Sequence, residues 1–88
     1  MFDDILLADG FDDALVGVSS RNIAVYDIEK CIKVLSKDMT AEEAVDYFYY
    51  NVEGAHMGEQ TPIYIHSDAE DIMDNLKKKN FRKHKANA

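Results

Sequence analysis

The sequence predicts an α+β domain in which a three-stranded, mainly antiparallel sheet packs on helices in two layers. Two observations lead to this prediction. Short runs rich in β-branched residues are bounded by turn residues, which is typical of strands. Longer segments repeat apolar residues every three or four positions behind capping residues, which is typical of amphipathic helices. Taken in chain order, these segments give the element order β-β-α-α-β-α.

The composition fits one small globular domain. The chain has 88 residues, 47% of them hydrophobic and 31% charged, a balance that excludes a disordered or collagen-like protein. We assign residues 1–76 to this domain and residues 77–88 to a basic helix end and flexible tail. No apolar run approaches the roughly 20 residues that span a bilayer, and the amino terminus lacks the basic start of a signal peptide. The single cysteine cannot form an internal disulfide, so we expect a cytoplasmic protein.

The first third of the chain predicts a short helical turn and then a β-hairpin. Two aspartates precede an apolar run near the start, which indicates one helical turn over residues 3–7. The apolar runs 14–18 and 23–26 are separated by Ser-Ser-Arg-Asn, and together they are typical of a hairpin. Gly17 inside the first run indicates a bulge or the close approach of another backbone.

Two helices are predicted next. Asp27 is placed to cap a helix that runs to Lys37, and Cys31 lies on the apolar stripe of this helix. We therefore interpret Cys31 as a buried small hydrophobic residue and not as a nucleophile. Thr40 to Glu43 form a capping box for a second helix. We expect Gly54 to end that helix in the left-handed conformation.

The last two elements are a strand and a helix. Residues 61–65 predict the third strand, with Pro62 tolerated at its start. Ser67 to Glu70 form a further capping box, which predicts a final helix. We expect this helix to turn four apolar residues inward: Ala69, Ile72, Met73 and Leu76.

Charge is distributed unevenly along the chain. The net charge is −7, but residues 1–76 hold four basic and 17 acidic side chains, a net charge of −13. Such a body repels nucleic acid and favours basic partners. The other six basic residues are Lys77, Lys78, Lys79, Arg82, Lys83 and Lys85. We interpret them as a solvated helix end, with contact to a polyanion or a tether onto the acidic body as alternatives.

No motif for catalysis or for a cofactor is recognisable. The early aspartates do not follow the spacing of a calcium loop. His56, His66 and His84 lack the spacing of a zinc site, and no glycine loop precedes a lysine as in phosphate-binding loops. We therefore expect no catalytic residue, no metal and no cofactor, with an enzyme that has a cryptic site as an alternative.

Residues 46–61 contain the strongest candidate for a binding surface. If Phe48 and Val52 face the core, the polar and aromatic residues between them cannot all be buried as well. Tyrosine combines a large apolar area with a polar tip, and aromatic residues are enriched at interfaces. We predict partner contacts from this segment and the connection after it: Tyr47, Tyr50, Asn51, His56 and Glu59. The alternatives are a tyrosine-rich core margin with an ordinary turn, or a small-ligand pocket.

Several blocks of the sequence carry a resemblance to known proteins. They are residues 11–17, 24–27, 30–32, 43–45, 47–48, 51–52, 54–55, 58–59 and 61–63. Through these blocks the chain resembles a family of small, largely uncharacterised proteins of tailed bacteriophages and prophages, and His56 and Met57 depart from its pattern. The resemblance implies a phage accessory protein made in the host bacterial cytoplasm. It carries no catalytic residues over to this chain.

These observations favour a non-catalytic protein that binds a host or phage protein, in host takeover or anti-defence. The less favoured hypotheses are a nucleic-acid-associated protein that uses the basic tail, and the cryptic enzyme. We also expect that a homodimer would cover a face or an edge of so thin a sheet.

Overall fold

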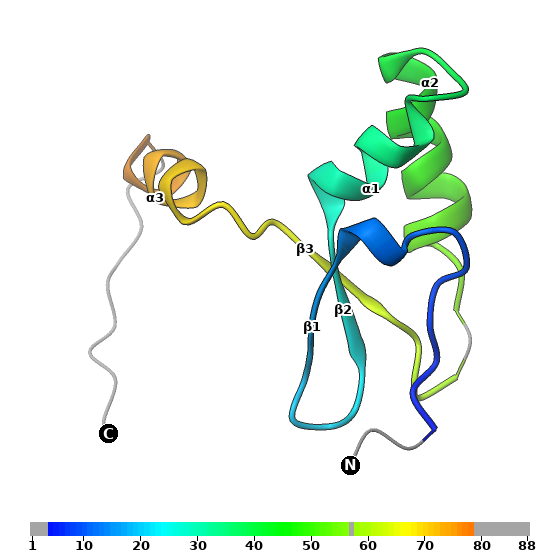
Figure 1. The fold of residues 1–88 in the computed structure, drawn as a ribbon. Coiled ribbons are helices and arrows are strands. Elements are labelled where there is room, and N and C mark those ends of the chain that lie inside the picture. The colour runs from blue at the N-terminus through cyan, green and yellow to red at the C-terminus, as the bar shows by residue number, and fades with distance from the viewer. Residues whose placement is uncertain (1–3, 57, 79–88) are drawn as a thin grey trace, which may run out of the picture.

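The computed structural model describes residues 4–56 and 58–78 (Figure 1). It confirms the α+β class and the order β-β-α-α-β-α. The elements are η1 (Asp12–Ala14), β1 (Leu15–Val18), β2 (Ala24–Asp27), α1 (Ile28–Leu35), α2 (Ala41–Tyr47), η2 (Phe48–Glu53), β3 (Ile63–Ile65) and α3 (Ala69–Lys78).

The three strands form one mixed sheet in the order β1-β2-β3. β2 pairs with β1 in antiparallel orientation and with β3 in parallel orientation. We expected a mainly antiparallel sheet, and one of its two strand pairs is parallel. Parallel neighbours need a long crossover connection between them. α1, α2 and η2 supply this crossover from β2 to β3.

The hairpin of β1 and β2 is closed by a turn that the sequence determines locally. Ser19 Oγ accepts from the backbone N–H groups of Arg21 and Ile23, both at 3.2 Å. Asn22 has a φ of 60°, a left-handed conformation that asparagine tolerates better than most residues. The pairing shifts register between Leu15 and Gly17, so the predicted irregularity at Gly17 is confirmed as a bulge.

The helical turn expected over residues 3–7 is wrong for residues 4–7, which form no helix. Helical geometry appears instead at η1, which begins with the second pair of aspartates, Asp12 and Asp13. Ile5 and Ala8 pack against the core, and the Ala8 N–H donates to the Tyr26 hydroxyl at 2.8 Å. A side chain of the sheet therefore satisfies a backbone donor that a helix would otherwise have satisfied.

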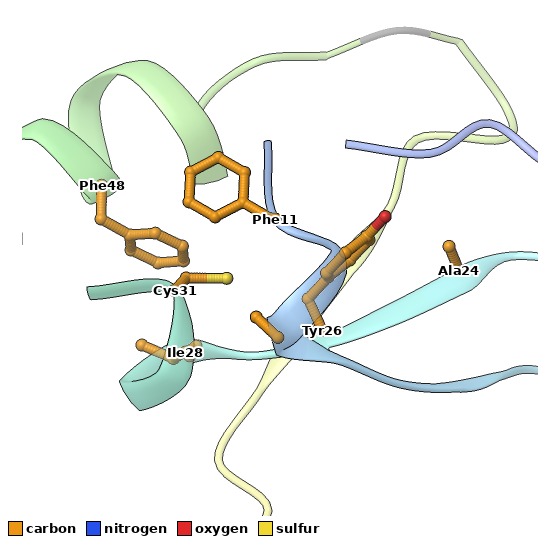
Figure 2. Close-up of a cluster of buried hydrophobic side chains, with 7 residues drawn as sticks. Phe11, Ala24, Tyr26, Ile28, Cys31 and Phe48 are labelled. Atoms are coloured by element: carbon orange, nitrogen blue, oxygen red, sulfur yellow. The ribbon is translucent and has the colours of Figure 1, made fainter. Parts of the chain in front are cut away.

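The core lies between one face of the sheet and the helices (Figure 2). Figure 2 shows Cys31 among the rings of Phe11 and Phe48, and Cys31, Tyr26 and Phe48 are fully buried. The prediction that Cys31 is a core residue is confirmed. Burying a large apolar side chain contributes about 1.5–3 kcal/mol, so each of the two buried rings stabilises the fold substantially.

The caps of the first two α-helices agree with the sequence prediction. Asp27 Oδ2 accepts from the Lys30 N–H at 2.8 Å, which makes Asp27 the N-cap of α1. Thr40 Oγ1 accepts from the Glu43 N–H at 3.1 Å, and the Glu43 carboxylate accepts from the Thr40 N–H at 3.3 Å. This reciprocal pair is the predicted capping box of α2.

The end of the second helix differs from the expectation. α2 continues as the π-helical segment η2, and Gly54 follows it with a φ of −75°. The prediction of a left-handed Gly54 is therefore wrong. The carbonyl oxygens of Tyr49 and Tyr50 lie 3.2 Å from where a Cβ of Gly54 would sit, so the close approach of backbone favours glycine here.

The last helix also corrects two predictions. The capping residue is Asp68 and not Ser67, because Asp68 Oδ1 accepts from the N–H groups of Glu70 and Asp71 at 3.0 and 3.2 Å. The apolar stripe expected to turn inward is not buried, since α3 contains no buried residue. Figure 1 shows α3 apart from the sheet and from the other helices.

Candidate functional site

Phe48 determines which side chains of the α2–η2 helix face outward. Its ring is fully buried and meets the rings of Tyr64 and Tyr49 edge to face, at centroid distances of 5.3 and 5.1 Å. Tyr64 in turn stacks on Tyr26 at 5.7 Å, so the helix is joined to the sheet through a continuous series of rings. With Phe48 turned inward, Tyr50 points to solvent and is 82% exposed.

An open groove of about 510 Å³ runs along this outward side. We call it the tyrosine–acid groove. It is lined by Asp38, Met39, Glu43, Asp46, Tyr47, Tyr50 and Asn51. The first two come from the connection between α1 and α2, and the others come from α2 and η2.

The chemistry of the tyrosine–acid groove suits a basic partner. It presents three carboxylates and two phenol rings, and all five of these residues are exposed. Carboxylates accept charge-assisted hydrogen bonds from arginine and lysine, and tyrosine faces attract the same cations. The groove therefore offers both kinds of contact to basic side chains.

The structure brings together three of the five predicted contact residues. Tyr47, Tyr50 and Asn51 line the groove, whereas His56 and Glu59 do not. Both of these lie exposed in the connection from η2 to β3. There the Gly58 N–H donates to His56 Nδ1 at 3.4 Å, so the imidazole makes a contact within its own loop.

Four residues of the groove were not predicted from the sequence: Asp38, Met39, Glu43 and Asp46. A signal existed for two of them. Glu43, Asp46, Tyr47 and Tyr50 follow the spacing i, i+3, i+4, i+7, which places them on one helical face. Asp38 and Met39 reach the groove only through the packing of α1 against α2, which no local spacing encodes.

The predicted polyanion contacts lie mostly outside the described residues. Lys77 and Lys78 occupy the last turn of α3, while Lys79, Arg82, Lys83 and Lys85 fall beyond residue 78. A different basic cluster appears on α1 and just after it. Its exposed members are Lys30, Lys33 and Lys37, which with Asp13 and Val34 line a groove of about 300 Å³. These lysines are three of the four basic residues among residues 1–76.

The buried Cys31 thiol is in an environment that disfavours its reactive, ionised form. Burial, together with the nearby Asp27 charge, raises the pKa of Cys31 to about 11, which keeps the thiol protonated and a poor nucleophile at neutral pH.

Within residues 4–56 and 58–78, no group of three or more His, Cys, Asp or Glu residues is arranged to hold a metal ion. No helix in these ranges has the length and apolar character to cross a bilayer.

Comparison with known proteins adds no relative. No protein-family model, no curated protein and no solved structure matches this chain.

Proposed function

We propose that this chain is a non-catalytic binding protein that contacts another protein through the tyrosine–acid groove. The observation that supports this most is the 82% exposure of Tyr50. Exposed tyrosines are common anchors of interfaces, because the ring supplies contact area while the hydroxyl stays hydrogen-bonded. Tyr47 lies in the same groove and is 45% exposed, so a partner would cover two rings at once.

The expected partner presents basic side chains. Asp38, Glu43 and Asp46 line the same groove as the two tyrosines, and residues 1–76 carry a net charge of −13. Complementary charge raises the rate of encounter and disfavours acidic competitors. Binding should therefore weaken as ionic strength rises, because exposed charges are screened beyond about 10 Å at 0.1 M salt.

The resemblance to small phage proteins gives this proposal a biological setting. A phage protein of this kind would be made in the cytoplasm of an infected bacterium and would act stoichiometrically on a host or phage protein. Host takeover or the suppression of a host defence is the role we propose. It rests on analogy at the level of protein class.

The proposal is tested by affinity capture with matched variants. The groove variant is Tyr50→Ala with Asp46→Lys, and the control is Leu7→Ala with Asp9→Lys, which makes the same charge change at exposed positions outside the groove. Wild type and control should recover the same protein from bacterial lysate, and the groove variant should lose it. Titration of the purified partner should then show an affinity loss of roughly 100-fold, or about 2.7 kcal/mol. Equal capture by both variants would remove the groove from consideration.

A further inference from the structure

The sheet has an apolar face that the core does not use. Tyr64 of β3 turns toward the core and stacks on Tyr26, so its neighbours Ile63 and Ile65 point to the opposite side. They are 41% and 36% exposed. Val25 of β2 pairs with Ile63 and shares this side. We call Val25, Ile63 and Ile65 the outer sheet face.

Gly17 extends the outer sheet face across β1. It pairs with Val25, which in turn pairs with Ile63, so the three residues form one row across all three strands. Apart from its two neighbours in the chain, none of the described residues has an atom within 4 Å of where a Cβ of Gly17 would sit. Because Gly17 has no side chain beside the branched side chains of Val25 and Ile63, this row leaves a depression into which the side chains of a helix can pack.

The part of the chain that the structure describes does not bury the apolar stripe of α3. Ala69, Ile72, Met73 and Leu76 follow the spacing i, i+3, i+4, i+7, and charged residues occupy most of the other positions. None of the four is buried, and Met73 is 40% exposed. An isolated helix shorter than about 12 residues is marginal in water, so α3 needs tertiary packing to be stable.

The start of α3 is fixed at the end of the sheet. Ser67 donates from its N–H and its Oγ to Asp27 Oδ1, at 3.1 and 2.5 Å. Only Asp68 lies between this anchor and the first residue of α3. The helix leaves the domain at this point, and Figure 1 shows it away from its own sheet.

We propose that two copies of this chain exchange α3, so that the apolar stripe of each α3 packs on the outer sheet face of the other copy. The lengths match: ten helical residues span about 15 Å at 1.5 Å each, and a four-residue strand spans about 13 Å. Exchange covers both unpartnered apolar surfaces while the Ser67–Asp27 anchor stays intact. The two contacts are identical by symmetry, as in a twofold dimer. The proposal is independent of the tyrosine–acid groove, which neither contact includes.

Complementation between two variants tests the exchange. Ile63→Glu places a charge on the outer sheet face, and Met73→Glu places one on the stripe of α3. Each variant alone should lose both contacts, with the dimer dissociation constant raised roughly 100-fold or more in sedimentation velocity. An equimolar mixture should recover a dimer, because the intact α3 of the first variant meets the intact sheet of the second. Val45→Glu, at an equally exposed valine on α2, should leave the dimer unchanged.

Three results would overturn the exchange. The first is a wild-type chain that stays monomeric at all concentrations, which would indicate that α3 docks within its own chain or stays free. The second is a dimer that neither charge affects, and the third is a mixture that recovers no dimer. If Ile63→Glu does not fold by circular dichroism, chains carrying Ile63→Cys are mixed with chains carrying Met73→Cys under an oxidant. Exchange predicts a disulfide between different chains, and its absence refutes the proposal.

Discussion

Ser67 donates two hydrogen bonds to Asp27, a residue 40 positions earlier in the chain. Both bonds go to Oδ1, while Oδ2 of the same carboxylate caps α1 by accepting from the Lys30 N–H. Asp27 is 95% buried at the end of β2. One carboxylate therefore joins the end of the central strand, the start of α1 and the chain that leaves β3.

Replacing Asp27 should weaken the whole domain. Asp27→Asn keeps the shape but turns one acceptor oxygen into a donor group that faces other donors. We expect urea titration to show that the free energy of unfolding of Asp27→Asn is about 1–3 kcal/mol lower than that of wild type. Asp68→Asn is the control, because asparagine caps helices as well as aspartate does. Equal stability of Asp27→Asn and wild type would show that the anchor contributes nothing.

The same carboxylate should give stability a specific pH dependence. Burial alone would raise the pKa of Asp27, but hydrogen bonds from the Ser67 side chain and from the Lys30 and Ser67 backbone, with the Lys30 charge, lower it below 3.8. A carboxyl group with a lowered pKa stabilises the fold above its unfolded pKa, and this contribution is lost as pH falls through the folded value.

We therefore expect the stability difference between wild type and Asp27→Asn to be constant above about pH 5 and to shrink below pH 3.8. Urea titrations of both proteins between pH 3 and pH 7 measure it. Comparing the two proteins cancels the other carboxylates. A difference that grows on acidification has the wrong sign for this explanation.

Tyr26→Phe should loosen the segment before η1. The substitution removes the hydroxyl that accepts from the Ala8 N–H and leaves the ring in place. We expect a loss of about 0.5–1.5 kcal/mol and faster hydrogen exchange at the Ala8 amide. Tyr50→Phe, at a ring that is mostly exposed, serves as the control and should change neither quantity. Unaltered exchange at Ala8 in Tyr26→Phe would contradict the role given to this hydroxyl.

Removal of residues 79–88 separates the protein-binding proposal from nucleic-acid binding. The truncated chain keeps the tyrosine–acid groove but loses four of the six clustered basic residues. We expect it to capture the same protein partner as the full chain, and neither chain to shift DNA or RNA in a gel at low salt. A shift by the full chain that truncation abolishes, with a steep salt dependence, would favour the nucleic-acid alternative.

The elements that sequence predicted well are those whose hydrogen bonds are local. The capping box of Thr40 and Glu43, the cap by Asp27 and the hairpin turn at Asn22 all join residues within a few positions. Ser67 also begins a sequence typical of a capping box, yet its side chain donates to Asp27. Asp68 caps α3 instead. A partner 40 residues away cannot be recognised from spacing. The hydrogen bond from the Ala8 N–H to the Tyr26 hydroxyl, where we expected a helical turn to end, also joins residues far apart in the chain.

The candidate site was predictable to a similar extent. The helical spacing from Glu43 to Tyr50 contains most of the groove, because one face of a helix follows from the sequence alone. Asp38 and Met39 join it through the packing of two helices, and His56 and Glu59 fall outside it although they follow closely in sequence. Beyond the end of η2, closeness in sequence to Tyr50 did not predict which residues line the groove.

The parallel pairing of β2 with β3 has a consequence for the order in which this protein folds. β1 meets β2 across a short turn, so the hairpin can close as soon as both strands have left the ribosome. β3 cannot pair until residues 28–62 have been synthesised and coiled into the crossover, and closing such a long loop costs more entropy. Until then β2 keeps one edge of unpaired N–H and C=O groups open to other chains. Misfolding and aggregation of the newly made protein should therefore begin at Ala24–Asp27, the strand that becomes the most protected one in the finished fold.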